Sequence, residues 1–406
     1  MNQRSDSPGL PTQPFFSTPQ QRLALARQRY FEEGVRPSGL VSEGVIQSWA
    51  RCLQAQRRPD EAITFATVTA SRAHSAVTRA RVLLAAAANE LSQLESTLAG
   101  TCCTVLLTDP HGVVVHSARA GYNADEVLLP LARRVGCNLA EDSIGTNAPG
   151  MTAHTGEASV VLGGEHFFGS VQVMHCAAAP IRDIHGQVAG VLDVTSESRP
   201  FGFDAASVVG LYATAIENRL LRAQSAEHIV VHLQTSPALL GTPMEGLAGI
   251  TSDGRIAWMN RAATRLLGMA RITGEQQADA VFALGMDSLA ALTRRSEASA
   301  HRLPNGLSVW LLARMQARDG ARQVVHIGAP ADAAAGSVAA PAAPVAADAS
   351  DRAAVVEPLS GTLRNSELNI ITRTLRACDG NVSKAARQLG VSRGLVYRHL
   401  KQVAEA

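Results

Sequence analysis

Apolar residues recur along the chain at two spacings and so predict both helices and strands. Between Ser71 and Leu98, and again between Asp204 and Ser225, apolar side chains return every three or four positions, as on one face of a helix. Runs that favour strands lie between these two segments, at 104–108, 113–116, 158–162, 167–175 and 188–195. Helices that flank strands joined by turns predict an α+β domain with an antiparallel sheet over residues 71–225.

A smaller α+β unit is predicted at residues 240–328. The runs Leu247–Thr251 and Arg255–Met259 flank a Ser-Asp-Gly turn, which is a hairpin pattern. Asn260 is placed to cap a helix that ends at Gly268. Strands near 307–312 and 323–327 would complete this unit.

The remaining segments flank or connect these domains. Residues 1–20 are rich in Pro, Gln and Ser and are expected to be disordered. Residues 21–70 contain two short helical patterns, and residues 329–358 form an Ala/Pro-rich linker. The last segment, 360–406, is expected to be all helical.

This last segment has the pattern of a helix-turn-helix. A first helix over 366–378 is broken by Asp379-Gly380, and Asn381 can cap a short second helix. Gly390 supplies the turn, and Ser392 can cap a third helix that starts at Arg393. The spacing therefore predicts three short helices in the order that a DNA-binding motif requires.

Charge is concentrated in the same segment. The chain carries a net charge of +2, yet residues 361–406 hold eight basic and three acidic side chains. A basic module of this kind is expected to meet a polyanion. Arg393 is placed to read a base, because recognition helices contact the groove with their first residues and Arg pairs well with guanine. The residues expected to contact DNA are Asn381, Ser392, Arg393, Tyr397, Arg398 and Lys401. The alternative is a three-helix cap with a charged surface.

The stretch CDGNVSKAARQLGVSRGLVYRHLK at 378–401 resembles the Fis-type helix-turn-helix that ends many bacterial enhancer-binding regulators. The resemblance covers about 40 residues. It implies a homodimer that binds double-stranded DNA at a pseudo-palindromic operator. Contact with RNA polymerase is left open.

The body of the chain is similar to the acetoin-catabolism activator family. The motifs that carry this likeness are SWARC at 48–52, IGTNA at 144–148, GEHF at 164–167, CAAAPIRD at 176–183 and GVLDVT at 190–195. The likeness implies a GAF-like sensor domain, and the unit around 253–268 is similar to a PAS domain. The expected fold class is thus α+β multidomain, with GAF-like and PAS-like domains and a C-terminal all-α helix-turn-helix.

The sequence departs from that family in two ways. No GxxxxGK[ST] loop is present, and lysine occurs only at Lys384 and Lys401, so we expect no AAA+ domain, no ATP hydrolysis and no sigma-54 remodelling. In the GAF-like segment, Leu139 replaces the usual tryptophan and Pro149 replaces the usual aliphatic residue. If that loop lines the pocket, ligand choice would differ from that of the relatives.

Four residues are candidates for contact with a small effector, namely Asn147, Glu165, His166 and Cys176. Asn147, Glu165 and His166 are interpreted either as groups that orient a ligand or as loop-bracing hydrogen bonds. No catalytic, metal or cofactor site is expected. The sequence shows neither the spacing of metal ligands nor a nucleophile beside a base. Burial is the favoured reading of Cys176, with a redox-sensing thiol as the alternative.

Composition narrows the class of protein. The six cysteines show no CxxC spacing and read as reduced thiols, and no apolar run is long enough to span a membrane, so the expected location is the cytoplasm. The expected function is a metabolite-responsive transcriptional regulator without ATPase activity. The alternatives are a modulator that pairs with a full-length relative and a GAF-fold thiol enzyme.

Overall fold

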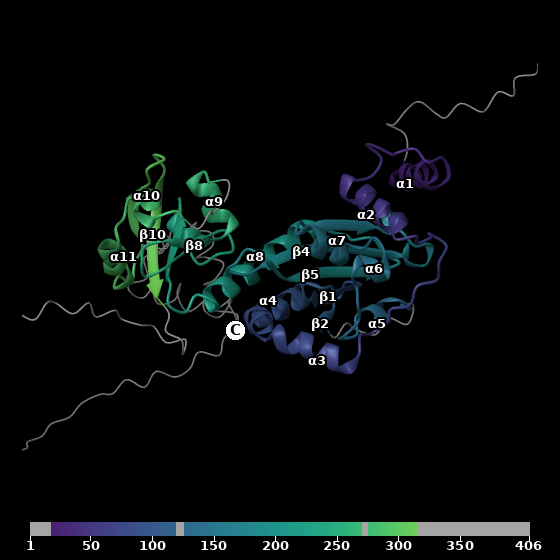
Figure 1. The fold of residues 1–406 in the computed structure, drawn as a ribbon, viewed down its shortest axis with the longest axis horizontal. Coiled ribbons are helices and arrows are strands. Elements are labelled where there is room, and N and C mark those ends of the chain that lie inside the picture. Colours follow the sequence, from purple (N-terminus) through teal and green to yellow (C-terminus); the bar gives the residue numbers. More distant parts are fainter. Residues whose placement is uncertain (1–17, 119–125, 270–274, 316–406) are drawn as a thin grey trace, which may run out of the picture. The chain divides into compact units, whose positions relative to one another are not determined.

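The computed structural model describes residues 18–118, 126–269 and 275–315. The expected strand at 323–327, the linker at 329–358 and the helix-turn-helix at 360–406 lie outside the described residues. Within the described ranges, no helix combines the length and the apolarity that crossing a bilayer needs. The described elements form two antiparallel sheets with helices packed against them (Figure 1).

Two α-helices lie before Ala70, as the sequence predicts. Helix α1, Pro19–Arg27, begins after Thr18, whose hydroxyl accepts a hydrogen bond from the backbone N–H of Gln21. It continues into a π-helical turn, η1, Gln28–Glu32. Helix α2, Glu43–Gln54, is capped in the same way by Ser42.

The helix expected over 71–98 is two helices, α3 (Ala70–Arg79) and α4 (Arg81–Thr97). The break falls at Ala80, where ψ is 1° instead of a helical value. The apolar spacing continues across this residue, so the pattern contains no signal for the break. Both helices bury their apolar faces in one core cluster.

The first sheet has the strand order β2-β1-β5-β4-β3, with all neighbours antiparallel. Its strands are β1 (Cys103–Thr108), β2 (Val114–Ser117), β3 (Ser159–Leu162), β4 (Met174–Arg182) and β5 (Val188–Glu197). Strands β1, β2, β3 and β5 lie within two residues of the runs that the sequence predicts. The strand expected at 167–175 is wrong, because β4 starts only at Met174.

Phe167 and Phe168 account for that error. Both rings are fully buried, but they belong to an irregular segment between two single 3-10 turns, η2 (Gly163–Glu165) and η3 (Gly169–Val171). They pack edge to face, with ring centroids 5.0 Å apart. Their apolar character therefore serves the core and not a strand pairing.

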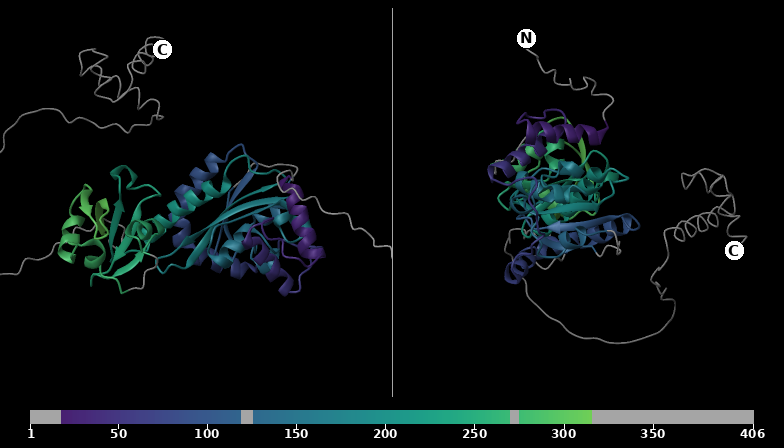
Figure 2. Two further views of the ribbon diagram at one scale, coloured as in Figure 1. Left: turned by 90° about the horizontal axis from the view of Figure 1, so that it is seen from above. Right: turned by 90° about the vertical axis from the view of Figure 1, so that its right-hand side faces the viewer.

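Side chains on the first sheet alternate between two cores, as the period of a strand requires. Leu107 and Ala177 pack with α3, α4 and helix α8 (Ala205–Ala223). Leu106 and Ala178 face the opposite side, with α2 and the short helices α5 (Leu129–Ala132), α6 (Glu141–Ile144) and α7 (Ala148–Thr155). Figure 2 gives two further views of these layers.

The second sheet has the order β8-β7-β6-β10-β9. Its strands are β6 (Ile229–Gln234), β7 (Gly246–Ile250), β8 (Ile256–Met259), β9 (Ser299–Arg302) and β10 (Ser308–Met315). Helices α9 (Arg261–Leu267), α10 (Ala278–Phe282) and α11 (Met286–Thr293) contribute to the core on one face, and the turn η4 (Pro237–Leu239) precedes β7. The predicted cap at Asn260 and the predicted end at Gly268 are both confirmed.

Strand β6 corrects the expected start of this unit at residue 240. It lies between β7 and β10 in the centre of the sheet, and all six of its residues are buried. A short apolar run without alternation cannot be assigned by its period, so the sequence pattern did not identify it.

Helix α8 serves both sheets. Val209 and Ile216 belong to the core of the first sheet. Leu221, one turn later, packs in a separate cluster with Val230 and Trp258 of the second sheet. One continuous helix of 19 residues thus supplies core side chains to both sheets.

Candidate functional site

A small cavity of about 30 Å³ lies on the face of the first sheet that carries α5, α6 and α7. Its apolar lining comprises Phe65, Leu106, Ala132, Leu139, Ile144, Pro149, Val171 and Met174. Its polar lining comprises Asn147, His166, Cys176, Asp193 and Thr195.

His166 lies in this lining and is neutral. Its Nδ1 is 2.9 Å from the carbonyl oxygen of Gly163, which can only accept, so Nδ1 carries the proton. Nε2 is then a lone-pair acceptor, 3.7 Å from Sγ of Cys176. Burial lowers the pKa of His166 to about 4, which keeps the ring uncharged near neutral pH.

Cys176 follows Met174 and His175 on β4 and is 5% exposed. Burial, and then the nearby Asp193 carboxyl, raise the pKa of its thiol well above the ordinary value. A thiol that stays protonated is a poor nucleophile and a poor redox sensor. Its position in the core therefore favours packing over thiol chemistry.

Asn147 lines the cavity, but its amide is used by the backbone. As the cap of α7, its Oδ1 accepts from the N–H of Gly150 at 2.8 Å. Its Nδ2 donates to the carbonyl oxygen of Gly145 at 2.7 Å. The contacts of Asn147 in the structure are thus the loop-bracing ones.

Glu165 is not part of the lining, unlike the other three candidates. Its Oε2 accepts from the N–H of Leu162 at 2.8 Å, and its carbonyl oxygen accepts from Nε1 of Trp49 at 2.8 Å. Burial raises the pKa of its carboxyl. Glu165 holds the loop that carries His166.

Asp193 is the residue that sequence reasoning overlooked, although it lies within the GVLDVT motif. It is completely buried on β5, where Oδ2 accepts from the hydroxyl of Thr195. Within the described part of the chain, its Oδ1 has no hydrogen-bond partner. Burial raises the pKa of this carboxyl to about 7. The available signal was a carboxylate inside the apolar run at 188–194.

Both departures from the family pattern lie at this cavity. Leu139 and Pro149 are part of its lining, and Leu139 is 4% exposed. The loop that contains Leu139 and Pro149 therefore lines the pocket, which is the condition under which we expect a different choice of ligand.

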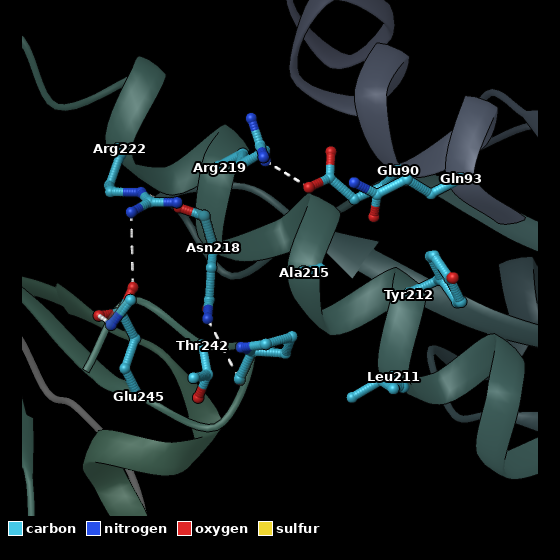
Figure 3. A pocket seen from close by; sticks show the side chains of 12 residues that line it. Glu90, Gln93, Leu211, Tyr212, Ala215, Asn218, Arg219, Arg222, Thr242 and Glu245 are labelled. Carbon is cyan, nitrogen blue, oxygen red and sulfur yellow. Dashed lines mark hydrogen bonds and ion pairs between the residues drawn. The ribbon is translucent and has the colours of Figure 1, made fainter. Parts of the chain in front are cut away.

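A second hollow, of about 270 Å³, lies beside α8 (Figure 3). In this view Arg219 points toward Glu90 of α4, and Arg222 points toward Glu245. Glu245 also accepts from Nδ1 of His232 at 3.0 Å. Most of the charged side chains that line this hollow are paired with one another, which is typical of a structural contact between elements.

No group of three or more His, Cys, Asp or Glu side chains is arranged to hold a metal ion in the ranges that the structure describes. The six residues expected to contact DNA, from Asn381 to Lys401, lie outside those ranges.

Comparison with known families assigns both ends of the chain. Residues 18–211 match the family described as MimR, N-terminal domain, and residues 362–402 match the bacterial regulatory protein, Fis family. The chain therefore combines a match to the MimR N-terminal domain with a match to the Fis-type helix-turn-helix. The resemblance inferred from the motifs at 378–401 is thereby confirmed.

The chain has relatives that are named as transcriptional regulators. It is 27% identical over 318 residues to the propane 2-monooxygenase operon transcriptional activator MimR of Mycolicibacterium goodii, covering 74% of this chain and 49% of that protein. It is 32% identical over 182 residues to the acetoin catabolism regulatory protein of Cupriavidus necator, covering 44% and 27%. The chain spans about half the length of the first of these relatives and about a quarter of the second.

Among solved structures, the chain is similar to the E. coli DhaR(N)–DhaL complex. The TM-score is 0.42 at 15% identity, and the match covers 67% of this chain and 99% of that chain.

Proposed function

We propose that the chain is a sequence-specific transcriptional regulator whose first, GAF-like domain binds a small metabolite and thereby changes DNA binding. The observation that carries the proposal is the buried cavity around His166 and Asp193, in the same chain as a Fis-family match at 362–402. Small-molecule sites are largely apolar pockets with a few placed polar groups, and this cavity has that composition. The place of action is the cytoplasm.

The helix-turn-helix would bind double-stranded DNA as a homodimer. Two copies of a basic tail on a pseudo-palindromic operator would place two recognition helices one helical turn apart. Arg393 would read a base, and Tyr397, Arg398 and Lys401 would hold phosphates or base edges. Asn381 and Ser392 would cap the second and third helices beside the DNA backbone.

Helix α8 offers a path from the cavity to the rest of the chain. It packs against β4 and β5, which carry Cys176 and Asp193, and it continues to the second, PAS-like domain. A ligand that binds one arrangement of β4 and β5 better than another would shift the population of α8 positions. That shift would alter the spacing or the occupancy of the two DNA-binding tails.

The regulator would act without ATP hydrolysis. The sequence holds no phosphate-cradling GxxxxGK[ST] loop, and its two lysines lie in the helix-turn-helix segment. We therefore propose repression, or activation through a polymerase form that needs no remodelling ATPase.

The test is genome-wide occupancy of the full chain, followed by mobility-shift titrations on the strongest site with and without metabolites of the neighbouring operon. A discrete palindromic site whose affinity changes with a metabolite supports the proposal. Binding that never exceeds non-specific binding at low salt contradicts DNA reading. An operator affinity that no metabolite changes contradicts the sensor role.

The second candidate is a modulator that pairs with a full-length relative. The observation in its favour is the extent of the match, since 74% of this chain aligns with 49% of a longer protein. Co-purification of differently tagged chains, this one and a full-length relative, would detect mixed dimers.

A further inference from the structure

The cavity in the first domain contains one unsatisfied polar atom. Asp193 is completely buried, and its Oδ2 is occupied by the hydroxyl of Thr195. Its Oδ1 has no partner among the described residues. A buried carboxylate oxygen without a donor is costly, by about 1–3 kcal/mol or more, and buried polar groups without partners are rare in folded proteins. Such an atom in the wall of a cavity indicates a missing donor.

The rest of the lining limits what that donor can be. The amide of Asn147 is engaged with Gly145 and Gly150, so Oδ1 of Asn147 is not free for a ligand. An ammonium group needs about three acceptors and would find too few. A carboxylate ligand would meet Asp193 as a like charge. The apolar walls formed by Leu106, Ile144 and Met174 suit a short carbon skeleton.

We propose that this cavity binds a small neutral alcohol, whose hydroxyl group donates a hydrogen bond to Oδ1 of Asp193. The carbon skeleton lies against Leu106, Ile144 and Met174, and the cavity of about 30 Å³ restricts the ligand to a few non-hydrogen atoms. This inference rests on the proposed sensor function and names the chemical class that the sensor reads.

The test uses three probes with the same carbon chain and the same number of non-hydrogen atoms. 1-Propanol offers a donor and an acceptor, propionitrile offers only an acceptor, and propylammonium offers a charged donor. Each is titrated into the full-length protein at pH 8, where Asp193 is ionised because its pKa is about 7. The readout is the ¹³C-methyl signal of Met174, which is assigned by its loss in Met174→Leu.

We expect 1-propanol to bind about tenfold more tightly than either other probe, as a hydrogen bond to a charged acceptor implies. Asp193→Asn gives a sharper expectation. Thr195 donates to the Oδ2 position, so the amide oxygen takes that place and the NH₂ replaces Oδ1. The variant then presents a donor, and the preference for 1-propanol over propionitrile should be lost, because both probes offer an acceptor. Glu157→Gln, an exposed carboxylate of the same domain, is the control and should leave the preference unchanged.

Equal affinities for 1-propanol and propionitrile in the wild-type protein, or tighter binding of propylammonium, would overturn the proposal even if Asp193→Asn does not fold. In both outcomes the cavity still binds a small molecule, so neither outcome contradicts the proposed sensor function. A failure of all three probes to move the Met174 signal would also overturn it. The sensor function is decided separately, by the effect of metabolites on operator affinity.

Discussion

The guanidinium of Arg27 donates a hydrogen bond to the carbonyl oxygen of His166 at 2.8 Å. The same side chain donates to the carbonyl oxygens of Gly164 at 2.9 Å and Phe167 at 3.1 Å. The Arg27 side chain thus binds three backbone carbonyl groups in the loop that carries His166. The N-terminal helix is therefore part of the support of the cavity, although it contributes no side chain to the lining.

Removal of this cation should loosen the loop. We expect Arg27→Ala to lower the free energy of unfolding by about 2–3 kcal/mol, because three carbonyl groups lose a charged donor. Denaturant unfolding measures the change. Arg22→Ala, an exposed arginine of the same helix, should change it by less than about 0.5 kcal/mol. Similar losses in both variants would contradict a specific role for Arg27.

Asp193 should make stability depend on pH. Burial raises its folded pKa to about 7, so between about pH 4 and pH 7 the folded state binds more protons than the unfolded state. Its contribution is present below pH 4 and is lost as the pH rises through 7. The free energy of unfolding of the wild type, relative to that of Asp193→Asn, should therefore fall across this window. The fall should be about 1.4 kcal/mol for each pH unit that separates the folded and unfolded pKa values. A flat difference would contradict the raised pKa.

His166 should act in the opposite direction. Burial lowers its folded pKa to about 4, so its contribution is present above about pH 6.5 and is lost as the pH falls toward 4. The difference between wild type and His166→Gln should shift in favour of the wild type as the pH rises from 4 to 6.5. Urea titrations at half-unit pH steps measure both differences. The same sign of slope in the two variants would rule out one of the two assignments.

Asn218 on α8 should contribute to the stability of the structural contact in Figure 3. Its Oδ1 accepts from Nδ2 of Asn260 at 2.8 Å, and its Nδ2 donates to the carbonyl oxygen of Pro243 at 3.3 Å. Asn218→Ala should lower the free energy of unfolding by about 1–3 kcal/mol, since buried groups lose their partners. Thr214→Ala, at an exposed site of α8, is the matched control. Thermal unfolding that is unchanged in Asn218→Ala would contradict this role.

Two residues of the tail should have separable effects on DNA binding. Arg393→Ala is expected to reduce discrimination between the operator and a scrambled site by about 1–3 kcal/mol, because it removes a base contact. Lys401→Ala is expected to weaken both sites alike and to lower the salt slope by about one, because it removes a phosphate contact. Fluorescence titrations at several salt concentrations measure both quantities. An Arg393→Ala protein that still distinguishes the two sites would show that this residue reads no base.

The parts of the fold that could be predicted are those with local signals. The cap at Asn260 and the end at Gly268 depend on residues adjacent in sequence, and both are where expected. Phe167 misled the strand assignment, because its burial is decided by distant rings such as Phe31, 5.6 Å away between centroids. Strand β6 carries no period of its own and is defined only by its neighbours in the sheet.

The candidate site could be predicted in part for the same reason. The structure brings His166 and Cys176 together, and both had been chosen for their chemistry. Glu165 is adjacent to His166 in sequence but faces the loop, because its carboxylate accepts from Leu162. Asp193 was missed because the sequence does not show that its carboxylate is buried or that one of its oxygens lacks a hydrogen-bond partner.

The sharing of α8 by two sheets has a consequence for dissection of the chain. Truncation after residue 223 would expose Leu221, which packs against Trp258, and would leave Asn218 without Asn260. A fragment that starts at β6 would expose the other side of the same contacts, including Trp258, which is 3% exposed in the intact chain. Neither half keeps a native surface at the cut, so residues 18–315 should melt in a single cooperative transition and resist proteolysis as one piece.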